Sequence, residues 1–168
     1  LVLGKSLLGT VTVDLKKIPH ILLGGSTGSG KSVLLKLLLM QAIKKGAVVC
    51  VADFKGGVDF NHWWGCSCDM VFTEGALLKQ LDQMMAILEQ RKRAFKEECP
   101  DLDTYNQKMG SHAPRFIFAC DEVAELLDKT GADSERKKLL AQIENKLSTI
   151  ARQGRAFGIH LILATQRP

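Results

Sequence analysis

The segment Gly25–Ser32 restricts the possible folds of this chain more than any other part of it. Its sequence, GSTGSGKS, has glycines at its first, fourth and sixth positions and ends in a lysine and a serine. The run before it, His20–Gly24, is short and apolar, and the run after it, Lys31–Lys45, has apolar residues at helical spacing. The pattern predicts a buried strand, a glycine-rich loop and a helix in succession.

A glycine-rich loop in this context binds phosphate. Small residues let backbone N–H groups converge on phosphate oxygens, and the start of the following helix favours anions. Lys31 supplies a positive charge for the β- and γ-phosphates, and the Ser32 hydroxyl can ligate Mg²⁺. We expect ATP to be bound by the eight residues Gly25, Ser26, Thr27, Gly28, Ser29, Gly30, Lys31 and Ser32.

Strands and helices alternate along the rest of the chain. Continuous apolar runs predict three further strands, at Ala47–Ala52, Arg115–Cys120 and Ile159–Thr165. Helices are predicted at Glu74–Glu98, Glu122–Lys129 and Glu135–Gln153, ended by Gly154. Such alternation predicts an α/β fold with a mostly parallel sheet and helices on both faces. The remaining segments are predicted to be a small hairpin (1–13), an irregular stretch (54–73) and a loop (100–114).

Length and composition indicate one globular domain, residues 1–168. No apolar run reaches the roughly 20 residues of a membrane helix, and no signal peptide is visible. The five cysteines are odd in number and irregular in spacing, which favours reduced thiols and a cytoplasmic domain. Because the chain starts at Leu1 without a methionine, we expect a fragment of a longer protein. Whether another segment of that protein forms a membrane anchor stays open.

Two carboxylates, Asp121 and Glu122, follow the predicted strand 115–120. Two interpretations fit them equally when they are taken alone. They can form the acidic first turn of a helix, or Asp121 can hold Mg²⁺ through water while Glu122 polarises the attacking water. The phosphate loop upstream favours the second interpretation, because phosphoryl transfer mostly needs positioning and charge neutralisation.

Three polar residues near the last predicted strand are further candidates. Gln166 follows this strand, where it can contact the γ-phosphate or the attacking water, although an ordinary loop glutamine fits as well. Arg152 and Arg155 flank a helix end. Either arginine can stabilise transition-state charge in a neighbouring subunit, or it can cap helix carbonyls.

The motifs GSTGSGKS, CDE and ARQGRAFGIHLILATQRP, in this order and spacing, resemble the FtsK/SpoIIIE motor family. The N-terminal stretch LGKSLLGTVTVDLKKIPHILLGG resembles the family's entry into the phosphate loop. The resemblance implies a RecA-like P-loop core, a hexameric homo-oligomer and ATP-driven movement of double-stranded DNA through a central pore. It also implies ATP-site roles for Lys31, Ser32, Asp121, Glu122 and Gln166. Arg152 and Arg155 match arginines of a family motif, and which of them reaches across a subunit boundary stays open.

The segment Asp53–Gly57, DFKGG, departs from the pattern of chromosome-segregation members. It resembles instead relatives in conjugative elements and in type VII secretion. The family motor also continues beyond ATQRP, so we expect the end of the core to be absent from this chain. The leading hypothesis is a double-stranded DNA translocase that serves conjugation or chromosome partitioning. The alternatives are a type VII-like protein-export ATPase and a nucleotide-binding module without turnover, and the intact Lys31, Asp121 and Glu122 disfavour the latter.

The net positive charge of the chain indicates less about its function. A net charge of +5 and a pI of about 9.0 fit an anionic partner and an ordinary basic surface equally. The cluster Arg91, Lys92, Arg93 and Lys96 is predicted to be a solvated helix end rather than a nucleic-acid patch. The group His62, Cys66, Cys68 and Asp69 has no standard zinc spacing, and Trp63–Trp64 is expected to pack over the sheet edge.

Overall fold

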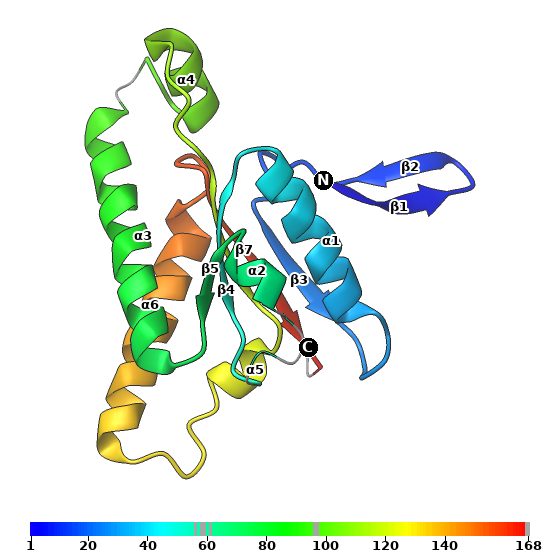
Figure 1. Ribbon diagram of the computed structural model, residues 1–168. Coiled ribbons are helices and arrows are strands. Elements are labelled where there is room, and N and C mark those ends of the chain that lie inside the picture. Colours follow the sequence, from blue (N-terminus) through cyan, green and yellow to red (C-terminus); the bar gives the residue numbers. More distant parts are fainter. Residues whose placement is uncertain (56, 58–59, 61, 96–97, 167–168) are drawn as a thin grey trace.

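A five-stranded sheet lies at the centre of the protein, and every neighbouring pair of its strands is parallel (Figure 1). The computed structural model describes residues 1–55, 57, 60, 62–95 and 98–166. The strands are β3 (His20–Gly24), β4 (Val48–Ala52), β5 (Asp69–Val71), β6 (Phe116–Cys120) and β7 (Ile159–Thr165), and their order in the sheet is β3-β7-β6-β4-β5. The predicted α/β class with a parallel sheet is confirmed.

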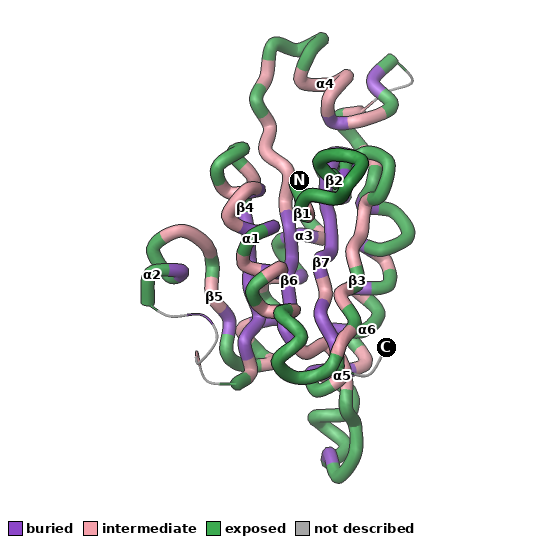
Figure 2. The backbone as a smooth tube through the Cα atoms, turned by 90° about the vertical axis from the view of Figure 1, so that its right-hand side faces the viewer, coloured by how far each residue is buried: buried purple, intermediate pink, exposed green. Residues whose placement is uncertain are grey.

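Helices cover both faces of this sheet (Figures 1 and 2). One face carries α1 (Lys31–Lys44) and α2 (His62–Gly65), and the other carries α3 (Glu74–Ala94), α5 (Val123–Leu126) and α6 (Ser134–Gln153). The helix α4 (Leu102–Met109) lies beyond one end of the strands, and the hairpin of β1 (Val2–Ser6) and β2 (Gly9–Thr12) projects from the body. Among the described helices, none has the length and apolar character needed to cross a membrane.

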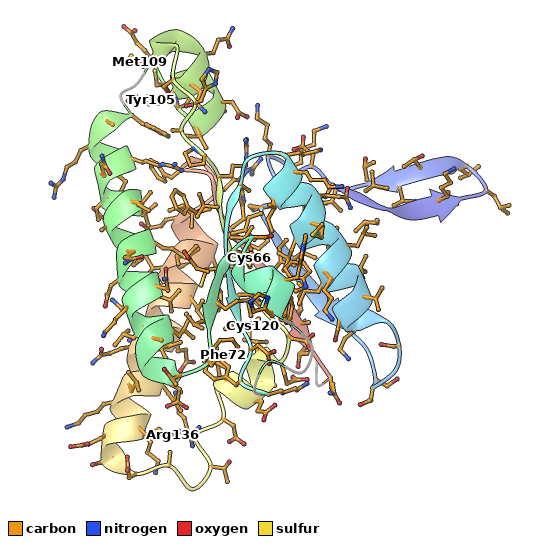
Figure 3. The ribbon with its side chains drawn as sticks, in the orientation of Figure 1. Cys66, Phe72, Tyr105, Met109, Cys120 and Arg136 are labelled. Carbon is orange, nitrogen blue, oxygen red and sulfur yellow. The ribbon has the colours of Figure 1, made fainter. Side chains whose placement is uncertain are left out.

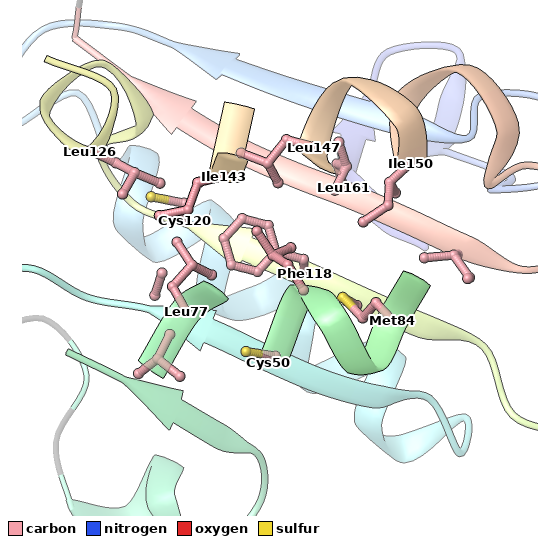
Figure 4. Close-up of a cluster of buried hydrophobic side chains, with 14 of the residues drawn as sticks. Cys50, Leu77, Met84, Phe118, Cys120, Leu126, Ile143, Leu147, Ile150 and Leu161 are labelled. Atoms are coloured by element: carbon pink, nitrogen blue, oxygen red, sulfur yellow. The ribbon is translucent and has the colours of Figure 1, made fainter. Parts of the chain in front are cut away.

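The strand β6 shows why its sequence is continuously apolar. Ile117 and Ala119 pack with α1, whereas Phe118 and Cys120 pack with α3 and α6 on the opposite face (Figure 4). All four side chains are buried. Because successive side chains of a strand point to opposite faces, a strand covered on both sides needs apolar residues at every position.

The strand order determines where the polar residues at the strand ends lie. Because β7 is inserted between β3 and β6, the carboxyl ends of these three strands and of β4 meet at one edge of the sheet. This edge is the place where ligands bind in open parallel sheets.

The predictions for residues 100–114 and 54–73 were wrong. The first segment contains α4, whose start is capped by the Asp101 side chain accepting from the Thr104 amide at 2.8 Å and whose end is followed by Gly110 at φ 59°. The second contains α2 and β5, a three-residue edge strand that exists because β4 pairs with it. Isolated strands this short have little propensity signal of their own.

The end of α3 also differs from the prediction. The helix ends at Ala94 because Phe95 turns to extended backbone and packs against the rings of Tyr105 and Phe157, with centroids 4.8 and 5.4 Å away. Of the basic cluster predicted to be solvated there, Lys96 lies outside the described residues, and Arg91 is only 8% exposed.

Arg91 is therefore a structural residue. Its guanidinium donates to the carbonyls of Phe157 and Pro114, the latter at 2.6 Å, and lies 5.3 Å from the ring centroid of Phe116. It joins α3 to the segments that lead into β6 and β7. The prediction of a solvated helix end is wrong for this arginine, because its side chain is buried. The two carbonyls and the ring supply the partners that a buried charge needs.

Candidate functional site

The glycine-rich loop lies between the carboxyl end of β3 and the start of α1. Gly28 and Gly30 have φ values of 78° and 88°, a left-handed backbone that side-chain-bearing residues rarely adopt. The Ser29 amide closes a turn by donating to the Ser26 carbonyl at 3.2 Å. Glycine is thus needed at positions 28 and 30 because the loop backbone is left-handed there.

Lys31 lies over this loop. Its ammonium donates to the carbonyls of Gly25 at 2.6 Å and of Ser26 at 3.1 Å. Beside it is a pocket of about 310 Å³, a size that fits a small polar ligand. The residues that line the pocket are Ser26, Thr27, Gly28, Gly30, Lys31, Ser32, Val33, Lys55, Asp121 and Gln166.

Ser32 and Asp121 meet on the wall of this pocket. The Ser32 hydroxyl lies 3.1 Å from each carboxylate oxygen of Asp121, which is only 5% exposed. A hydroxyl and a carboxylate are hard oxygen donors of the kind that Mg²⁺ takes. The two predicted metal-side residues, 89 positions apart in sequence, therefore form one donor set that fits this cation.

Glu122 is held by the end of β7. Its carboxylate accepts from the Thr165 hydroxyl at 2.9 Å and from the Gln166 amide at 3.0 Å. Thr165 is only 3% exposed. These contacts fix the orientation of the acid, and the sequence analysis did not identify Thr165 as a site residue.

Gln166 lies between the acidic pair and the phosphate loop. Its side-chain oxygen accepts from the Thr27 hydroxyl at 2.9 Å. Gln166 also lines a second, acidic pocket of about 490 Å³ that contains Glu122 and Glu125. The structure thus places Gln166 next to the phosphate loop and Glu122, whereas Arg167 and Pro168 lie outside the described residues.

Arg152 and Arg155 lie at the other end of the sheet. They flank the end of α6, next to the residues that lead into the start of β7, whereas the phosphate loop follows the end of β3. Arg155 donates through Nε to the Lys16 carbonyl at 2.8 Å, and Arg152 is exposed. The structure therefore does not bring either arginine to the phosphate loop of its own chain.

Asp53 and Lys55 lie at the same sheet edge as the acidic pair and were not predicted as site residues. Asp53 follows β4 and is only 2% exposed, and Lys55 lines the phosphate pocket with its ammonium 4.0 Å from Asp121. A usable signal was present, because Asp53 comes directly after a buried apolar strand and Lys55 two residues later, much as Asp121 and Glu122 follow theirs.

The cysteines lie outside the chemistry of the site. Burial raises the pKa of the Cys50 and Cys120 thiols to about 12 each and that of Cys68 to about 11, so these thiols stay protonated. Cys66 is exposed near α2, and Cys120 lies inside the fold next to the acidic pair (Figure 3). In the part of the chain that the structure describes, no three His, Cys, Asp or Glu side chains gather as a metal site.

The tryptophan pair that precedes Cys66 also serves packing. Trp64 is buried with the core on the α1 face, and Trp63 packs edge-on against it at 5.8 Å while remaining half exposed. This arrangement agrees with the packing role predicted for the pair.

Comparison with known proteins agrees with this geometry. The sequence profile described as the FtsK/SpoIIIE family matches residues 2–62. The DNA translocase FtsK of Campylobacter jejuni is 33% identical over 99% of the chain. The solved structure of the pCW3 conjugation coupling protein TcpA, in its monomer form with ATPgS, is 39% identical over the whole chain with a TM-score of 0.95.

A type VII secretion ATPase, the cytoplasmic domain of EccC from Thermomonospora curvata, is 26% identical over the whole chain with a TM-score of 0.72. The chain spans 18% of the Campylobacter translocase and 48% of the TcpA chain, so it corresponds to part of each. The phosphate loop, the acidic pair and these similarities agree: the chain is similar over its whole length to proteins of the FtsK/SpoIIIE family.

Proposed function

We propose that this chain is the ATP-binding and ATP-hydrolysing motor domain of a double-stranded DNA translocase. The observation that carries the proposal is the meeting of the phosphate loop, Asp121 and Glu122 at one sheet edge, with Ser32 3.1 Å from Asp121 and Glu122 held by Thr165 at 2.9 Å. These are the parts that phosphoryl transfer to water requires.

In this mechanism the phosphates lie against the loop amides and the Lys31 ammonium. Ser32 and Asp121 would hold Mg²⁺, which would neutralise phosphate charge at this site. Glu122 orients the attacking water and accepts its proton. The Thr165 hydroxyl and the Gln166 amide hold its carboxylate in the orientation that this role needs. Gln166, bonded to Thr27, links this acid to the phosphate loop and serves as the sensor of the terminal phosphate.

Double-stranded DNA is the substrate that the similarities favour. TcpA, a conjugation coupling protein, is the more similar of the two solved structures, with 39% identity against 26% for EccC and a TM-score of 0.95 against 0.72. FtsK, a DNA translocase, matches 99% of the chain. We therefore assign the domain to DNA movement in conjugation, with type VII-like protein export as the alternative that the EccC similarity keeps open.

The assembly we propose is a homo-oligomeric ring, a hexamer, with DNA in its central pore. Arg152 or Arg155 completes a neighbour's site in this ring, because both lie far from the phosphate loop of their own chain. We assign the domain to the cytoplasm; any membrane anchor of the protein would lie in other segments.

Turnover of the full-length protein, measured with and without double-stranded DNA, tests this function. We expect DNA to stimulate ATP hydrolysis, and Glu122→Gln to bind ATP while hydrolysing it at least about 100-fold more slowly. Glu135→Gln, in the exposed first turn of α6, is the matched control and should hydrolyse ATP normally. Parent-like turnover by Glu122→Gln contradicts the mechanism, and stimulation by a secreted polypeptide but not by DNA supports the alternative.

A further inference from the structure

The phosphate pocket contains a second lysine, Lys55, that the mechanism above does not use. Lys31, the first residue of α1, and Lys55, in the turn after β4, both line the pocket. Lys31 follows β3, whereas Lys55 follows β4 on the far side of β6. The two ammonium groups therefore reach the pocket from different segments of the chain, and that of Lys55 lies 4.0 Å from Asp121.

The backbone of Lys55 is fixed by Asp53. The Lys55 amide donates to the Asp53 carboxylate at 2.9 Å, and the Asp53 amide donates to the Val71 carbonyl at 3.0 Å. Asp53 is only 2% exposed, and its second carboxylate oxygen has no hydrogen-bond partner within the described residues. The turn that presents Lys55 is thus anchored to β4 and β5.

Two nearly buried carboxylates lie side by side at this point. Ala52 and Cys120 are register partners in the parallel pair of β4 and β6, so Asp53 and Asp121 follow at adjacent strand ends. Buried charge of one sign is costly unless a cation lies close by. The Lys55 ammonium, 4.0 Å from Asp121, is such a cation.

The ammonium of Lys55 is held less tightly than that of Lys31. Lys31 donates two hydrogen bonds to loop carbonyls, at 2.6 and 3.1 Å, whereas the 4.0 Å separation of Lys55 from Asp121 is too long for a hydrogen bond. The Lys55 side chain is about one third exposed, at 34%. A flexible four-carbon stem on a fixed turn lets the charge move within the pocket.

We propose that Lys55 contacts the terminal phosphate of a bound nucleoside triphosphate and lets this site distinguish triphosphate from diphosphate, with Asp53 as its positioning residue. The inference rests on the proposed nucleotide site and adds a residue to it. In the proposed site the loop amides and Lys31 hold the phosphates at the start of α1, so we expect the terminal phosphate to extend towards Asp121 and Lys55, which line the same pocket. The ligand class is a nucleoside triphosphate, recognised by charge at its γ-phosphate.

Calorimetry with ATPγS and with ADP, both with Mg²⁺, tests the inference on the full-length protein. We expect Lys55→Met to weaken ATPγS binding about tenfold and to leave ADP affinity within about twofold of the parent. Lys55→Arg, which keeps the charge, should retain most of the selectivity. Lys79→Met, an exposed lysine of α3, is the matched control and should change neither affinity.

The positioning role of Asp53 is tested by the same ratio of ATPγS affinity to ADP affinity. Asp53→Asn keeps an oxygen that can accept from the Lys55 amide and should retain most of the preference for ATPγS, whereas Asp53→Ala should lose it. Thermal melting of each variant separates this loss from a loss of folding.

An unchanged ATPγS-to-ADP ratio in Lys55→Met overturns the inference, and so does an equal loss of affinity for both nucleotides. Lys31→Ala distinguishes the two levels of the proposal. If Lys31→Ala binds both nucleotides like the parent, the phosphate-loop site itself is wrong. If Lys31→Ala loses both and Lys55→Met loses neither, only the role of Lys55 is wrong.

Discussion

The hydroxyl of Thr165 donates to a carboxylate oxygen of Glu122 across 2.9 Å and so joins the last residue of β7 to the acid that follows β6. The contact exists because β7 is the direct neighbour of β6 in the sheet. A carboxylate that must point at an attacking water gains from such a restraint, since catalytic groups act only in the correct orientation.

Removing the Thr165 hydroxyl should therefore slow hydrolysis without weakening nucleotide binding. We expect Thr165→Val to lower kcat about tenfold with little change in KM, because Glu122 loses one of its two fixed donors. Steady-state kinetics measures this split. Thr149→Val, which removes a hydroxyl that bonds within α6 to the Asn145 carbonyl, is the control, and equal kcat values for both variants would show that the Thr165 contact is unimportant.

The phosphate loop, Asp121 and Glu122 were predictable from the sequence, because each lies within a few residues of a continuous apolar run that predicts a strand. Thr165 was not identified, because its contact with Glu122 depends on which strands are neighbours in the sheet, whereas Asp53 and Lys55 follow a recognised apolar strand and were predictable in the same way as Asp121. Strand order is set by packing between distant segments, and local sequence does not report it.

The missed helix α4 has a different cause. Asp101 and Gly110, its capping residues, were present in the sequence, but the helix is short and largely polar, with Leu102 as its buried residue. Short polar segments have a weak periodic signal, so their caps are the better guide.

The trans-arginine proposal predicts that subunits complement each other. A ring-forming protein with Arg152→Ala or Arg155→Ala should lose most turnover, since an arginine given in trans contributes roughly 10³–10⁵ in rate in other P-loop enzymes. Mixing this protein with Lys31→Ala subunits should restore part of the activity, because an intact arginine then faces an intact phosphate loop. Turnover that stays absent on mixing, across a wide range of protein concentration, would contradict this arrangement.

Gly154 is required by close packing rather than by its backbone angle. The residue has an ordinary helical φ of −65°, but a Cβ there would lie 2.3 Å from the Ile159 carbonyl oxygen. We expect Gly154→Ala to lower the free energy of unfolding by about 2 kcal/mol or more.

Gly75 in α3 provides the matched control for that substitution. A Cβ at Gly75 meets no described atom within 4 Å, so Gly75→Ala should be neutral or stabilising by up to about 1 kcal/mol. Urea titration of both variants measures the difference, and equal stabilities would show that the backbone at Gly154 relaxes freely.

His160 predicts a specific loss of stability in mild acid. Burial lowers its pKa from 6.5 to about 4, while its Nδ1 donates to the Pro19 carbonyl at 3.0 Å. Between these pH values the unfolded chain binds a proton that the folded protein does not, so the free energy of unfolding falls as the pH is lowered from 6.5 towards 4. The contribution of this one group is about 2–3 kcal/mol.

Replacing His160 by asparagine removes the titration and keeps a donor for Pro19. The difference in unfolding free energy between the parent and His160→Asn should therefore shift in favour of the variant as the pH falls from 6.5 to 4. A difference that is constant over this range would show that His160 does not titrate as its burial implies.

The central claim is that Gly25–Ser32 is a nucleotide site, and calorimetric titration of the full-length protein with ATPγS and Mg²⁺ tests it most directly. The parent protein should bind with one site per chain, and Lys31→Ala should bind at least about tenfold more weakly or not at all, because a charged contact to the phosphates is lost. Equal affinity of the parent protein and Lys31→Ala would contradict the assignment of this loop and with it the proposed motor function.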